Sequence, residues 1–109
     1  MTSILANAAA SANAPKLRRL PNGLTIIAEQ MPVEAVNLSL WMGVGSAVES
    51  DEINGMAHFL EHMIFKGTST LQSGEFEQKI EQLGAVTNAA TSQDYTYYYI
   101  TTAPQDFAK

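Results

Sequence analysis

Two histidines and a glutamate stand close together in the middle of the chain, at His58, Glu61 and His62. On a helix, at about 100° of rotation per residue, the histidines lie one turn apart on one face, with Glu61 beside them. Imidazole and carboxylate groups are costly to bury unless something pairs with them. A divalent metal ion is the simplest partner, so the spacing predicts a metal-binding helix.

The chemistry that these residue types favour is zinc-dependent hydrolysis. Zinc is commonly held by imidazole nitrogens, and catalytic zinc sites use three protein ligands and leave one position for water. His58 and His62 would supply two ligands. Glu61 could take a proton from a water molecule whose pKa the metal lowers to about 7, in the inverted H-x-x-E-H order. An alternative stays open, in which the histidines are ordinary surface or core residues and Glu61 makes a helix contact.

Composition excludes several other classes of protein. The chain has 109 residues and a formal net charge of −5, and its basic residues form no patch beyond Arg18-Arg19, which argues against nucleic-acid binding. The absence of cysteine excludes thiolate metal sites, so a metal must use histidine and carboxylate ligands. No run approaches the roughly 18–20 apolar residues of a membrane span, so no membrane partner is expected.

The first residues differ in composition from the rest. Residues 1–15 are rich in Ala, Ser and Asn and carry no charged side chain, so they match neither a secretory signal nor an arginine-rich transit peptide. We expect a flexible tail at 1–15, an ordered region at 16–109 and, in the absence of a targeting pattern, a cytoplasmic location.

Alternation and turn residues predict the strands. Pro21-Asn22-Gly23 is a turn signal, and Val36–Val44 alternates so that its apolar residues share one face, which we expect to be buried. Ser92-Gln93-Asp94 separates two segments, the second of which has a high β preference. The expected strands are Leu17–Leu20, Leu24–Glu29, Val36–Val44, Ala85–Thr91 and Tyr95–Thr102.

Two helices are expected between these strands. The motif helix lies within Gly55–Gly67, its apolar residues lie opposite the histidines and should be buried, and Gly67 should end it. The second helix runs from about Gly74 to Leu83, with Ser73 as N-cap and Gly84 after its end. The order of elements indicates an α+β fold with an antiparallel sheet and helices packed on one face.

The motif and its flanks resemble a known family. Gly55–Thr68 resembles the signature of the pitrilysin/insulinase metallopeptidases, closest to the branch of the mitochondrial processing peptidase and its bacterial relatives. Leu20–Leu24, Trp41–Ser46 and Gly84–Ser92 resemble family segments before and after that signature. The resemblance covers about residues 16–103.

The resemblance implies roles for particular residues. His58 and His62 would be zinc ligands and Glu61 the general base. Asn88, Ala89 and Ala90 would match the strand edge along which family members bind an extended peptide, because an unpaired edge offers N–H and C=O groups. For Asn88, a turn or bulge residue is the open alternative.

The family's third zinc ligand is a glutamate further beyond the motif than this chain extends. Glu75, Glu77 and Glu81 come too early to match it. We therefore expect the chain to be the N-terminal part of a larger peptidase domain, with weak metal affinity and little peptidase activity alone. The partners implied are the remainder of the peptidase chain or a second subunit, in a homo- or hetero-oligomer.

Two other functions stay open from the residues alone. One is a non-catalytic binding or scaffold subunit of the same family. The other is a free-standing metal-binding domain, in which Glu49, Asp51 or Glu52 would complete the ligand set.

Overall fold

The computed structural model describes residues 14–109, which fall into two compact units that meet between Val33 and Glu34. The first unit contains one hairpin, and the second contains the predicted site. Residues 1–13, which make up most of the tail expected at 1–15, lie outside the described residues.

The first unit is a two-stranded antiparallel hairpin. Strands β1 (Lys16–Arg19) and β2 (Thr25–Ala28) pair in a register that runs from Lys16 opposite Ala28 to Arg19 opposite Thr25. The turn closes where expected, since the N–H of Gly23 donates to the carbonyl of Leu20 at 2.9 Å. Gly23 has a φ of 92°, a left-handed conformation that favours glycine.

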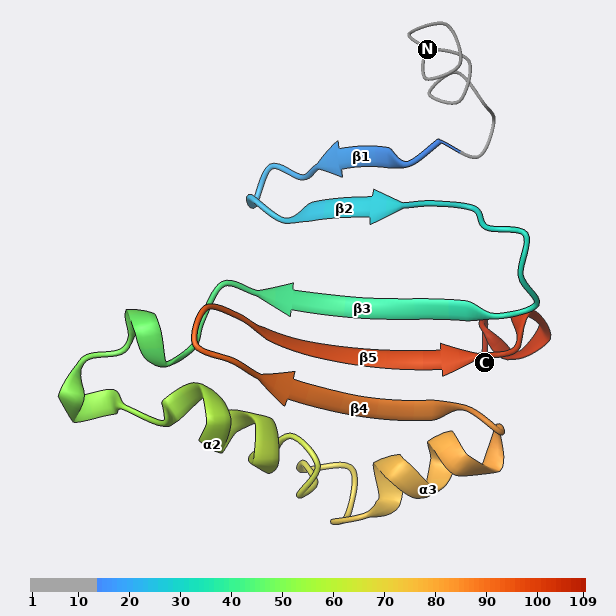
Figure 1. Cartoon of the computed structure of the whole chain (residues 1–109). Helices are drawn as coiled ribbons and strands as arrows, with labels where there is room; N and C mark the ends of the chain where they lie inside the picture. Colours follow the sequence, from blue (N-terminus) through green and yellow to red (C-terminus); the bar gives the residue numbers. More distant parts are fainter. Residues whose placement is uncertain (1–13) are drawn as a thin grey trace, which may run out of the picture. The chain divides into compact units, whose positions relative to one another are not determined.

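The second unit is built on a three-stranded antiparallel sheet in the order β3-β5-β4 (Figure 1). The strands are β3 (Val36–Met42), β4 (Val86–Thr91) and β5 (Thr96–Thr102), close to the ranges predicted. A turn at 92–95 joins the last two, with the N–H of Ser92 donating to the carbonyl of Tyr95 at 2.8 Å. The fold class is therefore α+β, as predicted.

The two faces of this sheet differ. One carries a ladder of aromatic rings in which Trp41 stacks on Tyr97 with 4.6 Å between ring centroids, and Tyr97 stacks on Tyr99 at 5.8 Å. Residues that alternate with these, such as Leu38, Leu40 and Tyr98, point to the opposite face. Both helices of the unit lie on that opposite face, as expected.

Helices α2 (Met56–Met63) and α3 (Glu75–Gln82) lie against β4 (Figure 1), and their ends differ from the prediction. Helix α2 ends at Met63 rather than at Gly67. Gly67 is needed for a different reason: its φ is 102°, and a Cβ there would lie 2.7 Å from the carbonyl oxygen of Leu71. At α3 the N-cap is Gly74 rather than Ser73, and the Glu75 carboxylate accepts the N–H of Gln72 at 2.8 Å.

The apolar faces expected to be buried are largely exposed in this chain. The motif helix has only Ala57 buried, and the apolar side chains opposite its histidines are 44–62% exposed. Leu38 and Leu40 on β3 are 60% and 50% exposed. The prediction of burial was wrong for the chain as it stands, because no other described element covers these side chains.

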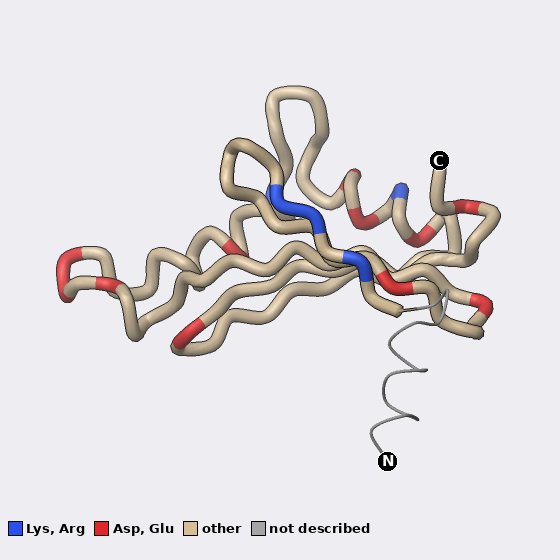
Figure 2. Tube along the Cα trace, turned by 90° about the horizontal axis from the view of Figure 1, so that it is seen from above, with Lys and Arg blue, Asp and Glu red and all other residues tan. Residues whose placement is uncertain are grey.

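The charged side chains of the second unit are mostly acidic. Its three basic residues are Lys66, Lys79 and Lys109. Acidic positions, red in Figure 2, are spread along the trace. Lys79 pairs with Glu75 at 3.5 Å and Lys109 with Asp106 at 2.8 Å, so two of these three positive charges each have a carboxylate beside them. Between residues 14 and 109, no helix is both long and apolar enough to cross a membrane.

Candidate metal centre

The loop before α2 fixes where the motif helix begins. Gly45 packs so tightly against the β4–β5 turn that a Cβ would collide with the carbonyl oxygens of Ser92 and Gln93. The N–H of Ala47 donates to the Gln93 carbonyl at 2.9 Å. These contacts hold the loop, and therefore the start of α2, beside the end of β4.

The first turn of α2 is stabilised by a side chain from this loop. Gly55, with a φ of 91°, is the N-cap and offers no side-chain acceptor. The Glu49 carboxylate takes that role: its two oxygens accept the N–H groups of Gly55 at 3.0 Å and of Ala57 at 2.8 Å. Two of the donors that every helix leaves free at its N-terminus are thereby satisfied.

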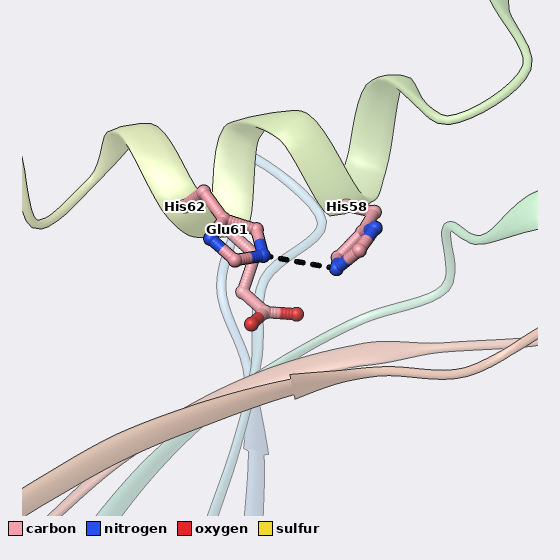
Figure 3. Close-up of side chains that lie close together, drawn as sticks. All are labelled: His58, Glu61 and His62. Carbon is pink, nitrogen blue, oxygen red and sulfur yellow. Dashed lines mark hydrogen bonds between the residues drawn. The ribbon is translucent and has the colours of Figure 1, made fainter.

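His58, Glu61 and His62 all project from the same side of α2 toward the sheet (Figure 3). The Nε2 atoms of His58 and His62 lie 3.0 Å apart, and one ligand atom from each of the three side chains lies within 4.8 Å of the others. Both histidines are exposed and Glu61 is half-buried. The structure therefore brings together the three residues predicted from the motif.

The spacing of the imidazoles suits a single zinc ion. Two nitrogens bound tetrahedrally to one zinc, each about 2.0–2.1 Å from it, lie about 3.3 Å apart. The observed 3.0 Å requires only a small movement of either ring. No Cys, no further His and no other carboxylate among residues 14–109 joins the cluster, so Glu49, Asp51 and Glu52 do not complete the ligand set here.

Glu61 is the member of the cluster that contacts the sheet. One of its oxygens, Oε2, accepts a hydrogen bond from the hydroxyl of Thr91 at the end of β4. The hydroxyl of Tyr98, on the neighbouring strand, is buried without a partner among the described residues. Burial, and secondarily the charge of Glu61, raises the pKa of Tyr98. Sequence reasoning assigned no role to Thr91 or Tyr98, and it considered Glu49 as a possible metal ligand rather than as a helix cap.

The three residues matched to a peptide-binding edge lie on β4. Asn88, Ala89 and Ala90 pair in regular register with Tyr99, Tyr98 and Tyr97 of β5, so Asn88 is in a strand rather than in a turn or a bulge. Within residues 34–109 the other side of β4 has no strand partner. The Oδ1 atom of Asn88 accepts the N–H of Ala89 at 2.8 Å.

A hollow of about 330 Å³ opens beside His58 and is lined mostly by polar residue types. It brings the loop, the helix start and the end of β4 together around one space. Its walls are formed by Ser46, Glu49, Gly55, His58, Thr91, Ser92 and Gln93.

The sequence profile of the insulinase family, peptidase family M16, matches residues 24–109, which is most of the chain. The chain belongs to this family. Helix α2, strand β4 and the turn that follows β4 all lie within the matched residues.

Relatives in the M16 family include zinc proteases and processing peptidases. The chain is 48% identical over 79 residues to an uncharacterized zinc protease of Bacillus subtilis, YmxG, covering 72% of this chain and 19% of that protein. It is 44% identical over 90 residues to a probable mitochondrial-processing peptidase subunit beta of Arabidopsis thaliana, covering 82% and 17%. The chain thus spans about a fifth of the length of these relatives.

Solved structures of two bacterial proteases share the fold. A protease from Helicobacter pylori matches with a TM-score of 0.79 and 34% identity, over 86% of this chain and 23% of that one. The periplasmic protease PqqL from Escherichia coli matches with a TM-score of 0.76 and 33% identity, over 85% and 11%.

Proposed function

We propose that the chain forms the zinc-binding segment of a metalloendopeptidase that hydrolyses peptides or precursor extensions. The observation that carries the proposal is the convergence of the His58 and His62 Nε2 atoms, 3.0 Å apart, beside the Glu61 carboxylate. Family membership supports it, because relatives of the chain are named zinc protease and processing peptidase.

In this proposal each of the three motif residues has one task. His58 and His62 hold the zinc ion through Nε2. Zinc, when bound, acidifies a water molecule and polarises a carbonyl group. Glu61 accepts the proton of the attacking water and returns it to the leaving amine, the work of a general base and then of a general acid.

The substrate is an extended peptide that pairs with the free edge of β4 at Asn88, Ala89 and Ala90. The position of β4 at the edge of the three-stranded sheet supports this way of binding, because unpaired backbone groups can bind a peptide as an added strand. The N–H of Ala89 donates to the Asn88 side chain, and the carbonyl of a bound peptide would replace that acceptor.

The remainder of the site is proposed to come from further protein. The family resemblance implies a glutamate as third ligand beyond Lys109, and a second domain or subunit that encloses the peptide. A homo- or hetero-oligomer agrees with a relative that is named as a subunit. A cytoplasmic location stays a prediction, since relatives include one named mitochondrial and one named periplasmic.

The test is a comparison of Glu61→Gln with His62→Ala in the full-length gene product. Glu61→Gln should keep zinc, measured by atomic absorption, and lose about 10²–10⁴-fold in kcat for a fluorogenic peptide. His62→Ala should lose zinc. Glu52→Gln, an exposed residue in the loop before the helix, is the matched control.

The opposite results separate the peptidase from the scaffold subunit. A Glu61→Gln protein that cleaves peptides like wild type would remove Glu61 from the mechanism. A wild-type protein that binds its partners yet neither holds zinc nor cleaves any peptide would favour the scaffold.

A further inference from the structure

The Glu61 carboxylate is anchored at one oxygen only. Oε2 accepts the hydroxyl hydrogen of Thr91, and no Lys or Arg within residues 14–109 forms an ion pair with Glu61. In the proposed mechanism the other oxygen, Oε1, accepts the proton of the attacking water. A glutamate side chain has several rotatable bonds, and a charge-assisted hydrogen bond restricts the conformations that they would otherwise sample.

Thr91 also belongs to the strand that offers the free edge. Hydrogen-bonded pairs alternate along an antiparallel ladder, and Ser92 already bonds to Tyr95. The alternation turns the backbone groups of Ala90 toward β5 and those of Ala89 and Thr91 away from it. One residue thus presents its hydroxyl to Glu61 and its backbone to the edge.

We propose that Thr91 is a positioning residue that holds the Glu61 carboxylate at a fixed place relative to a peptide paired with β4. The proposal rests on the proposed function, in which Glu61 is the base and β4 the peptide-binding edge. The contact links residues 30 positions apart in the sequence, one on the helix and one on the strand. If α2 moved relative to β4, Glu61 would therefore be displaced from a peptide paired with β4.

The structure also shows why Tyr98 does not replace Thr91. Tyr98 lies opposite Ala89 on β5, and its hydroxyl forms no hydrogen bond with Glu61 or with any other described residue. The phenol therefore does not hold the Glu61 carboxylate. Removing the Thr91 hydroxyl therefore leaves the carboxylate free to turn.

The experiment compares Thr91→Val, which removes the hydroxyl at nearly constant volume, with Thr91→Ser, which keeps it. In the full-length gene product Thr91→Val should lower kcat for a peptide roughly tenfold, with KM and zinc content unchanged, because the backbone edge and the histidines are intact. Thr91→Ser should restore most of kcat. Thr87→Val is the matched control, since that hydroxyl donates to the Tyr99 carbonyl at 3.0 Å instead.

A second measurement does not depend on activity. In the metal-free protein, Thr91→Val should lower Tm by a few degrees when Glu61 is present, and by much less in a Glu61→Ala background. If valine prevents folding, Thr91→Ala serves the same two comparisons.

The outcomes are distinguishable. The positioning role would be overturned if Thr91→Val had the kcat of wild type or changed KM alone. It would also be overturned if Thr91→Val lowered Tm equally with and without the Glu61 side chain. A different result would be that no form of the protein cleaves peptides while the Tm losses remain non-additive. The contact between Thr91 and Glu61 would then be confirmed, but the proposed function and the catalytic role of that contact would both be wrong.

Discussion

The phenol of Tyr98 and the carboxylate of Glu61 share one small region between the helix and the sheet. Burial is the main cause of the raised pKa of Tyr98, and the negative charge of Glu61 is the second. Both effects disfavour the phenolate, so a neutral Tyr98 is part of the native site.

We predict that the stabilising contribution of neutral Tyr98 is lost at high pH. Because its folded-state pKa is raised, the contribution is complete below the unfolded value of about 10 and disappears as the pH rises through the higher folded value. Carbon-13 NMR of labelled tyrosine, with Tyr98→Phe for assignment, measures this pKa directly.

The same spectra separate the two causes of the raised pKa. Glu61→Gln should bring the pKa of Tyr98 part of the way back, since burial remains. Asp94→Asn, which removes an acidic residue at the β4–β5 turn, should leave it unchanged. A Tyr98 pKa unaffected by Glu61→Gln would show that burial alone raises it.

At the scale of the element, the motif helix α2 depends on a residue outside itself. Glu49 bonds two N–H groups of the first turn of α2, where Gly55 offers no side chain. We predict that Glu49→Ala lowers the free energy of unfolding by about 1–2 kcal/mol, the size of a lost N-cap, as measured by urea denaturation.

The control for the cap is Glu52→Ala, which removes an acidic residue from the same loop. Exposed substitutions of this kind usually stay within about 0.5 kcal/mol. Equal losses in the two variants would mean that Glu49 acts through its charge near the helix and not through its two hydrogen bonds.

The start of α3 predicts a dependence on pH. The pKa of Glu75 is lowered chiefly by the hydrogen bond from the Gln72 N–H, and further by Lys79. Because its folded-state pKa is lowered, Glu75 stabilises the fold at pH values above its unfolded-state pKa. This stabilisation is lost as the pH falls through the folded-state pKa. Glu75→Gln should therefore lower Tm at pH 7, and the difference from wild type should shrink toward pH 3. Glu81→Gln, in the same helix, should show no such convergence.

Local patterns predicted the elements better than their ends. Alternation in Val36–Val44 and the turn at Pro21-Asn22-Gly23 sufficed for strands and a hairpin, because both signals act between near neighbours. Gly67 was misassigned because its left-handed φ serves a close approach to Leu71 rather than a helix end. Helix length is also decided by packing, which a glycine in the sequence does not reveal.

The site was predictable as far as it is local. His58, Glu61 and His62 lie within about one and a half turns of a helix, so their spacing fixes their common side. The contact between Glu61 and Thr91 spans 30 residues and two elements, and the bonds from Glu49 reach six and eight residues ahead. Such contacts depend on how the elements pack, and no short motif encodes them.

At the scale of the molecule, the chain has far more apolar surface than its small core requires. Ala57 and Ala85 are its buried apolar residues among those described, while Phe59 on α2 and Leu38 on β3 are 62% and 60% exposed. Patches of this kind mark surfaces that pack against further protein. The M16 relatives are several times longer than this chain, so we propose that their additional segments cover the corresponding faces.

The candidate metal centre also has fewer ligands among the described residues than a catalytic zinc site needs. The described cluster consists of two imidazoles and the Glu61 carboxylate, which we propose to be the base, whereas catalytic zinc sites use three protein ligands. Loss of a residue that merely supports a ligand costs about 10–100-fold in metal affinity, so a missing ligand should cost at least the upper end of that range. The 109-residue chain expressed alone should therefore bind zinc on the order of a hundredfold more weakly than the full-length gene product, and should cleave peptides little or not at all.

Competition with a chromophoric chelator measures the zinc affinity of both forms, and the fluorogenic peptide measures turnover. A His58→Ala chain provides the baseline for adventitious zinc binding. Because exposed apolar faces favour self-association, sedimentation must accompany the assay, so that a monomer is compared with a monomer. Robust turnover by a monomeric 109-residue chain would show that His58, Glu61 and His62 suffice, and that the ligand proposed beyond Lys109 is not needed.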